Sequence, residues 1–136
     1  MASRLNPYIH FNGEARAAME FYKGVFGGEL SASTFKEFGG SHAPEDDEKL
    51  MHSQLETPSG YTIMASDTPT GMDYNPGESI TISLSGDGDE LRGYFEGLAD
   101  GGKMTMPMEK QVWGDEFGMV TDRFGINWMV NVAAAG

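Results

Sequence analysis

The chain repeats itself, and this repeat restricts its fold more than any other feature. A shift of 73 residues superposes two segments that each contain a predicted strand, a turn and a helix. The superposed pairs are Ile9 with Ile82, Phe11 with Leu84, Gly13 with Gly86, Ala18 with Leu91, Tyr22 with Phe95 and Val25 with Leu98. Each predicted helix ends in a glycine pair, at 27–28 and at 101–102, which is typical of a helix C-terminus.

The second half of each copy repeats at a different shift. Here 65 residues separate the matching positions, and 51–66 fall on 116–131 as two alternating strands around a glycine turn. The two shifts differ by eight residues, so the first copy holds about eight extra residues between helix and hairpin. The polar, glycine-rich stretch 39–48 predicts a loop at that place, with His42 exposed to solvent.

Each copy therefore predicts a strand, a helix and three further strands. We expect two four-stranded antiparallel sheets, each with a helix on one face and the other face in need of cover. Pairing the sheets would enclose a cleft between eight strands, with the helices outside, and such a concave space suits a ligand. The predicted class is α+β, with one domain over 1–136 that comprises modules of about 5–70 and 78–133.

Composition excludes several classes of protein. The chain has no cysteine, so it can form neither a disulfide nor a thiolate metal site. Its formal net charge is −12 and its nine Lys and Arg residues are scattered, so we expect neither nucleic acid nor a membrane as partner. No apolar run reaches the roughly 20 residues of a membrane span, and the first residues do not form a signal peptide. We expect a cytoplasmic protein.

Several segments carry a family resemblance. They are Pro7–Gly13, Phe21–Tyr22, Phe26–Gly28, Met51–Leu55, Ile63–Asp67 and, most specifically, Trp113–Asn131. In these segments the chain resembles the vicinal oxygen chelate superfamily, which includes glyoxalase I, extradiol dioxygenases and the bleomycin and fosfomycin resistance proteins. It is most similar to the PhnB-like branch. The resemblance implies a cytoplasmic bacterial protein that forms a homodimer.

The resemblance also bears on metal binding. Catalytic members hold a divalent metal with His or Glu from the first and last strands of both copies. The last-strand positions fall on Met64 and Met129 in this chain. The first-strand positions fall near Pro7 or Tyr8 and near Ile80 or Thr81. Because methionine is a poor ligand for Mg²⁺, Mn²⁺ or Zn²⁺, we expect no metal and no other cofactor.

Two histidines leave a second possibility open. Side chains two apart on a strand share a face, so His10 lies beside Tyr8, and His52 beside Gln54. If both faces line the cleft, His10, His52 and Glu56 approach one another as an unusual metal site. The alternative is that each histidine hydrogen-bonds a neighbour within its sheet.

Methionine and aromatic residues suggest an apolar surface. Strict alternation over Lys103–Lys110 would put three methionines on one face, where they line a deformable cleft, fill a core or contact a second copy. Pro107 predicts that this strand is an edge or carries a bulge. Trp128 adjoins Met129, so if Met129 faces the cleft, Trp128 packs beneath the helix and Asn131 joins the cleft.

These observations support three hypotheses about function. The first is a metal-independent protein that binds a small, partly apolar molecule between the sheets. The second is a metal-dependent lyase, isomerase or dioxygenase, and the third is an interaction module whose cleft is filled by its own methionines. No catalytic residue is assigned. The predicted ligand-binding residues are Tyr8, His10, His52, Gln54, Met64, Ser66, Trp113, Phe117, Met129 and Asn131.

Overall fold

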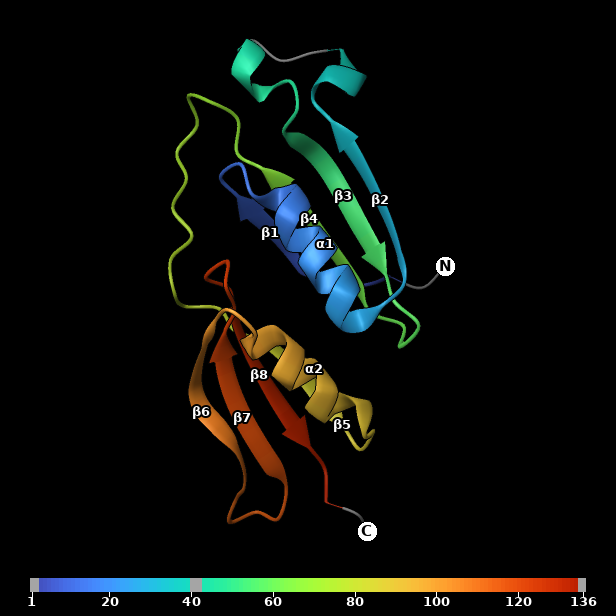
Figure 1. Cartoon of the computed structure of the whole chain (residues 1–136), viewed down its shortest axis with the longest axis vertical. Coiled ribbons are helices and arrows are strands. Elements are labelled where there is room, and N and C mark those ends of the chain that lie inside the picture. Colours follow the sequence, from blue (N-terminus) through green and yellow to red (C-terminus); the bar gives the residue numbers. More distant parts are fainter. Residues whose placement is uncertain (1–2, 40–42, 135–136) are drawn as a thin grey trace. The chain divides into compact units, whose positions relative to one another are not determined.

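The two copies of the repeat form two compact units. A computed structural model describes residues 3–39 and 43–134 of the chain. It divides into Met1–Pro76, here called module one, and Gly77–Gly136, called module two (Figure 1). His42 lies outside the described residues. That both modules belong to a single domain stays a prediction.

Both modules have the predicted order of elements. Module one contains β1 (Tyr8–Phe11), α1 (Ala15–Phe26), β2 (Glu29–Thr34), the short 3₁₀ helices η1 (Lys36–Phe38) and η2 (Pro44–Asp46), β3 (Leu50–Glu56) and β4 (Thr62–Asp67). Module two contains β5 (Ile82–Gly86), α2 (Glu90–Ala99), β6 (Lys103–Lys110), β7 (Glu116–Thr121) and β8 (Asn127–Val132). Within the described ranges, no helix is long and apolar enough to cross a membrane.

The sheets are mixed, and the prediction of antiparallel sheets is wrong. The strand order is β1-β4-β3-β2 in module one and β5-β8-β7-β6 in module two. In each, the first strand runs parallel to the last. The reason is geometric: the helix returns the chain so that β2 runs in the direction of β1, and two hairpin reversals then give β4 that same direction. The α+β class with two βαβββ modules is confirmed.

Each helix covers one face of its sheet, as Figure 1 shows. α1 buries residues at helical spacing, namely Ala15, Ala18, Met19, Tyr22 and Phe26. They pack on the buried sheet residues Leu55, Ile63 and Ala65. In module two, Trp128 lies beneath α2 with 1% of its surface exposed, as the alternation with Met129 predicts. The other face of each sheet, here called the helix-free face, carries the remaining side chains of its strands.

A buried carboxylate fixes the start of α1. Asp67, at the end of β4, is 4% exposed. Its Oδ1 accepts the backbone N–H groups of Gly13 and Ala15, each at 2.9 Å, and its Oδ2 accepts that of Leu50 at 3.0 Å. A negative charge at the N-terminus of a helix is stabilising, and these N–H groups have no partner inside the helix. One side chain thus joins β3, β4 and α1.

A bulge in β3 changes which residues reach the helix-free face. Thr34 pairs with Leu50 and Ser33 with His52, which leaves Met51 as an extra residue. Leu50 and Ser53 are both buried beneath the helix although they are three positions apart, an odd spacing that regular alternation would place on opposite faces. The bulge therefore turns Met51 to the same face as His52.

Bulges also break the alternation of β6. β6 is an edge strand with two register shifts, so the prediction from Pro107 is confirmed. The prediction that its three methionines share one face is wrong. Met104 pairs with the buried Val120, whereas Met106 pairs with Met119 on the helix-free face.

Candidate functional site

The helix-free face of module one holds six of the predicted ligand-binding residues. They are Tyr8, His10, His52, Gln54, Met64 and Ser66. The strand register places Tyr8 beside Met64 and His10 beside Ser66. Gln54 lies on the other side of Met64, so a continuous row crosses β1, β4 and β3. The alternation of side chains along strands, which the prediction used, brings these residues together.

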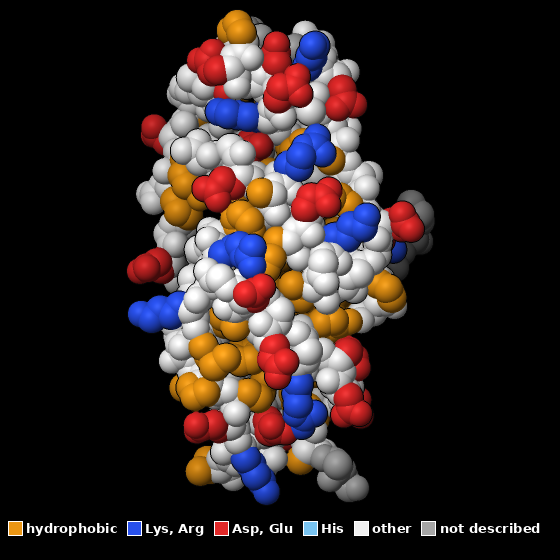
Figure 2. Space-filling model, in the orientation of Figure 1, with side chains coloured by type: hydrophobic (Ala, Val, Ile, Leu, Met, Phe, Trp, Pro, Cys, Tyr) orange, Lys and Arg blue, Asp and Glu red, His pale blue; other side chains and the backbone are white. Residues whose placement is uncertain are grey.

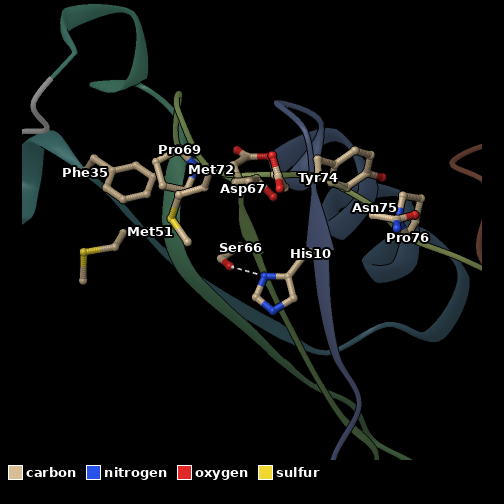
Figure 3. A pocket seen from close by; sticks show the side chains of 12 residues that line it. His10, Phe35, Met51, Ser66, Asp67, Pro69, Met72, Tyr74, Asn75 and Pro76 are labelled. Atoms are coloured by element: carbon tan, nitrogen blue, oxygen red, sulfur yellow. Dashed lines mark hydrogen bonds between the residues drawn. The ribbon is translucent and has the colours of Figure 1, made fainter.

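The two histidines hydrogen-bond their neighbours. Tyr8 Oη and His52 Nδ1 share a hydrogen bond at 3.2 Å, and Ser66 Oγ and His10 Nδ1 share one at 3.4 Å (Figure 3). The Tyr8 ring lies between the imidazoles, with centroids 5.3 Å from that of His10 and 5.8 Å from that of His52. The network supplies hydrogen-bond donors and acceptors, and the tautomers decide which nitrogen donates.

Glu56 is held by other partners. Its Oε1 accepts the hydroxyl of Thr62 at 2.9 Å and the amide of Gln54 at 2.7 Å. These two hydrogen bonds, that of Thr62 first, lower the pKa of Glu56 below its ordinary value. Among the described residues, no three His, Asp or Glu side chains are grouped so as to hold a metal ion.

The positions where catalytic relatives hold a metal carry other chemistry here. Tyr8 pairs with Met64, and Ser83 pairs with Met129, so these four residues occupy the equivalent places. The expected position near Ile80 or Thr81 is wrong, because β5 begins only at Ile82 and its register is displaced from the 73-residue shift. None of the four is a carboxylate or an imidazole, so these residues do not fit a divalent metal.

A cavity opens beside His10 and Ser66. Its volume is about 500 Å³ and it lies wholly within module one. In Figure 3, His10 and Ser66 lie between two walls, with Phe35 and Met51 on one side and Tyr74 on the other. The segment that follows β4, residues 68–76, contributes to both sides: in Figure 3, Pro69 and Met72 lie on the side of Phe35, and Asn75 and Pro76 lie with Tyr74 on the other, here called the second wall. The arrangement places the His10–Ser66 pair between walls that combine apolar and aromatic side chains with the polar side chains of Thr68, Asp73 and Asn75.

Hydrogen bonds attach the segment 68–76 to the rest of module one. The Thr68 N–H donates to the carbonyl of Phe11 at 2.7 Å. The Thr70 N–H and hydroxyl both donate to the Asp46 carboxylate, each at 2.8 Å. Lys49 Nζ lies 2.8 Å from the same carboxylate, and this hydrogen bond is the main reason why the pKa of Asp46 is lowered and that of Lys49 is raised. The segment thus has a defined attachment to η2.

Sequence reasoning missed much of this cavity. The missed lining residues are Phe35, Met51, Asp67, Thr68, Pro69, Met72, Asp73, Tyr74, Asn75 and Pro76. Half of them follow residue 70, beyond the predicted end of module one. A usable signal exists, because a plain linker is polar and this one contains Met72 and Tyr74.

The four predicted residues of module two lie on or near the helix-free face of their own sheet. Phe117 pairs with Asn131, and Met129 pairs with Met119. Trp113 lies in the turn between β6 and β7, where its ring meets that of Phe117 edge to face at 6.1 Å. Module two therefore presents an aromatic and thioether surface, and the module-one cavity includes none of these residues.

The side chain of Asn131 also forms a hydrogen bond within module two. Its side-chain amide donates to Asp115 Oδ2 at 2.9 Å, and the Ala134 N–H donates to Oδ1 at 2.9 Å. These hydrogen bonds, that of Asn131 first, lower the pKa of Asp115. A ligand that used the Asn131 amide would compete with this carboxylate.

Comparison with known proteins agrees with the fold. A family model described as 3-demethylubiquinone-9 3-methyltransferase matches residues 3–131. Protein YjdN of Escherichia coli K12 is 31% identical over 140 residues, with 94% of each chain covered. The crystal structure of PA1353 from Pseudomonas aeruginosa is 38% identical with a TM-score of 0.82, over 98% of this chain and 100% of that one.

Further structures extend the comparison. A PhnB protein from Bacillus cereus, titled a putative 3-demethylubiquinone-9 3-methyltransferase, has 22% identity and a TM-score of 0.76 over 96% of this chain and 100% of that one. Fosfomycin resistance proteins FosX share the fold at 11% to 16% identity and TM-scores of 0.55 to 0.62. The expected glyoxalase/bleomycin-resistance-like fold is confirmed. The chain belongs to the PhnB-like family described as 3-demethylubiquinone-9 3-methyltransferase.

Proposed function

We propose that the chain is a small-molecule-binding protein that needs no metal, and that the module-one cavity is its binding site. The observation that carries this proposal is the cavity itself. Its volume of about 500 Å³ falls in the range of known small-ligand sites, and methionine and aromatic side chains flank the His10–Ser66 pair.

The lining chemistry suits a partly apolar ligand. Met51 and Met72 have flexible, polarisable side chains that adapt to ligands of varied shape, and Phe35 adds a flat apolar surface. Ser66 and His10 can orient one polar group of the ligand. Tyr8, His52, Gln54 and Met64 extend the same face, and we include them as further ligand contacts.

Metal independence rests on the residues at the family's ligand positions. Met64 and Met129 replace the His or Glu of catalytic relatives, and Tyr8 and Ser83 complete the set. We expect purified protein to carry no stoichiometric divalent metal and to bind none on titration with Mg²⁺, Mn²⁺ or Zn²⁺. Stoichiometric binding of any of the three would contradict this part of the proposal.

The chain's own methionines provide the test of the site. Methyl-¹³C labelling of the ten methionines gives probes in both modules for a screen of small aromatic and aliphatic compounds. Because the family description names a quinone, the screen includes a small benzoquinone. A compound at 100 times its Kd should stabilise the fold by about 2.7 kcal/mol in a thermal-shift assay.

The methyl signals then locate the ligand. We expect the Met51 and Met72 signals to shift on binding, since both residues line the cavity. Met19, in the core beneath α1, and Met104, in module two, are the matched controls and should stay unchanged. Shifts confined to Met119 and Met129 would move the site to module two, where Trp113, Phe117, Met129 and Asn131 remain predicted contacts.

The cellular context is a further part of the proposal. We propose a cytoplasmic bacterial protein that forms a homodimer, as the family resemblance implies. The bacterial relatives support the origin. Light scattering on the purified chain should give twice the monomer mass of 14.8 kDa. A mass equal to that of the monomer would exclude the homodimer.

A further inference from the structure

We infer that the module-one cavity selects uncharged or cationic ligands and rejects anions. This inference rests on the proposed function, because it names the chemical class that the same cavity would take. It depends on the charges around the cavity, on the carboxylate that already occupies the start of α1, and on the aromatic walls.

The lining residues carry negative charge only. Among the twelve described residues that line the cavity, none is Lys or Arg, and two are carboxylates, Asp67 and Asp73. Asp73 lines the cavity from the exposed part of the segment that follows β4. An anion entering this space would leave water without gaining a positive partner, which is costly.

One cation near the lining residue Asp67 is already paired. Lys49 Nζ lies 2.8 Å from Asp46, and this hydrogen bond raises the pKa of Lys49, so the pair stays ionised. Module one as a whole has eleven Asp and Glu residues against five Lys and Arg. Figure 2 shows the helix-covered face, which is not the face of the cavity, and there too the basic side chains stand singly among acidic ones. A cleft with one sign of charge raises the local concentration of ligands of the opposite sign.

The start of α1, which lies near the cavity and favours anions, is already occupied by a carboxylate. A helix N-terminus offers backbone N–H groups to a negative ligand. Here the N–H groups of Gly13 and Ala15 donate to Asp67 Oδ1, at 2.9 Å each, so the protein supplies its own carboxylate. Asp67 therefore already takes two of the N–H groups at the start of α1, and its charge opposes a ligand phosphate or carboxylate there.

The walls suit a cation or a neutral ring. Phe35 and Tyr74 present aromatic side chains on opposite sides of the cavity (Figure 3). An ammonium group over such a ring is attracted by its electron density, and a neutral aromatic ligand gains contact with the thioethers of Met51 and Met72. We therefore expect a small aromatic or aliphatic body that is neutral or bears an amine.

Three probes of nearly equal shape test this inference. They are 1-naphthylmethylamine as the cation, 1-naphthylmethanol as the neutral molecule and 1-naphthoate as the anion, measured by calorimetry and by the Met51 and Met72 methyl signals at about pH 8. We expect the amine to bind about tenfold more tightly than the anion, with the alcohol between them. The advantage should shrink in about 0.5 M salt.

A pair of matched variants assigns the preference to the cavity. Asp73→Asn removes the exposed carboxylate of the wall and should reduce the amine-to-anion ratio about threefold, with little effect on the alcohol. Asp87→Asn removes an exposed carboxylate from the turn before α2 and should leave the ratio unchanged.

The outcomes separate the two proposals. Binding of naphthoate as tight as that of the alcohol, or an equal effect of both variants, overturns the charge selectivity and leaves the cavity as a binding site. If none of the three probes shifts the Met51 and Met72 signals, the proposed binding site itself fails, and the selectivity with it.

Discussion

The two modules share their topology, but the buried carboxylate that joins their elements, here called the anchor, lies at opposite ends of the two sheets. In module one, Asp67 at the end of β4 holds the start of α1. The position 65 residues later is Val132, whose side chain can accept no hydrogen bond. In module two, Asp122 after β7 accepts the N–H groups of Phe124 and Ile126 and the indole N–H of Trp128.

Module one has a weaker version of the second anchor. Thr57 stands at the position of Asp122, and its hydroxyl accepts the Tyr61 N–H at 3.0 Å. The common feature is the apolar layer between helix and sheet, which both copies keep. The comparison teaches that the apolar layer determines the fold, whereas the buried carboxylate can stand at either end of the sheet. It also places the anchor of module one beside the cavity.

The largest expected effect is the loss of the module-one anchor. Asp67→Ala leaves three backbone N–H groups without their acceptor and should reduce the free energy of unfolding by about 4 kcal/mol. Val132→Ala, at the equivalent position, removes only apolar contacts and should cost about 1 kcal/mol. Urea unfolding measures both. Equal losses of unfolding free energy would mean that the ends of β4 and β8 contribute equally to stability, and module one would then have no special anchor at Asp67.

The second effect concerns the anchor of module two. Asp122→Ala removes the acceptor of three hydrogen bonds, including that of the buried Trp128 indole, and should cost about 3 kcal/mol. Thr57→Ala removes one acceptor and should cost about 1 kcal/mol. The difference between the two urea midpoints is the quantity to measure. If Thr57→Ala lost more free energy of unfolding than Asp122→Ala, Thr57 could not be the weaker of the two anchors.

A third test exchanges one residue beneath the helices. Gly118 and Ser53 are equivalent, and a Cβ at Gly118 would come within 2.7 Å of Phe95 Cε1. Gly118→Ser should therefore destabilise module two by about 2 kcal/mol through overpacking. The double variant Gly118→Ser with Phe95→Leu makes room for the new side chain and should lose less than the sum of the single variants. Strict additivity would show that Phe95 is not the obstacle.

The smallest effect is a dependence on pH at the attachment of the cavity wall. The pKa of Asp46 is below its ordinary 3.8, and the main cause is the hydrogen bond from Lys49. The folded state therefore favours the ionised carboxylate. The stabilisation is complete above 3.8 and is lost as the pH falls through the lower folded value. Urea midpoints of the native chain and of Asp46→Asn should therefore converge on acidification. A gap that widens at low pH would contradict this sign.

Much of the fold could be predicted because periodicity reports burial. Helical spacing over 15–26 and the alternation of Trp128 with Met129 both gave correct faces. The parallel pairing of β1 with β4 could not be predicted, since alternation carries no information about strand direction. The bulge at Met51 was missed for a related reason: a bulge depends on the register of two strands, and one strand's pattern does not contain it.

The candidate site also has a part that the sequence predicts and a part that it does not. Tyr8, His10, Gln54 and Ser66 were brought to one face by alternation alone. The opposite wall of the cavity lies in an irregular segment, where side-chain direction follows from tertiary contacts such as that of Thr70 with Asp46. No local rule predicts such a contact, so the linker was assigned no role.

The parallel pairing of the first and last strands has a consequence for the order of folding. His10 and Ser66, partners in neighbouring strands, are 56 residues apart in the chain, whereas β3 and β4 pair through a short hairpin and β2 and β3 through a longer loop that contains η1 and η2. Closing so long a loop is slow compared with forming local hairpins, so β1 completes its sheet last. During synthesis, the first strand must wait until β4 has left the ribosome. Because β1 contributes His10, the cavity is complete only once module one has finished folding.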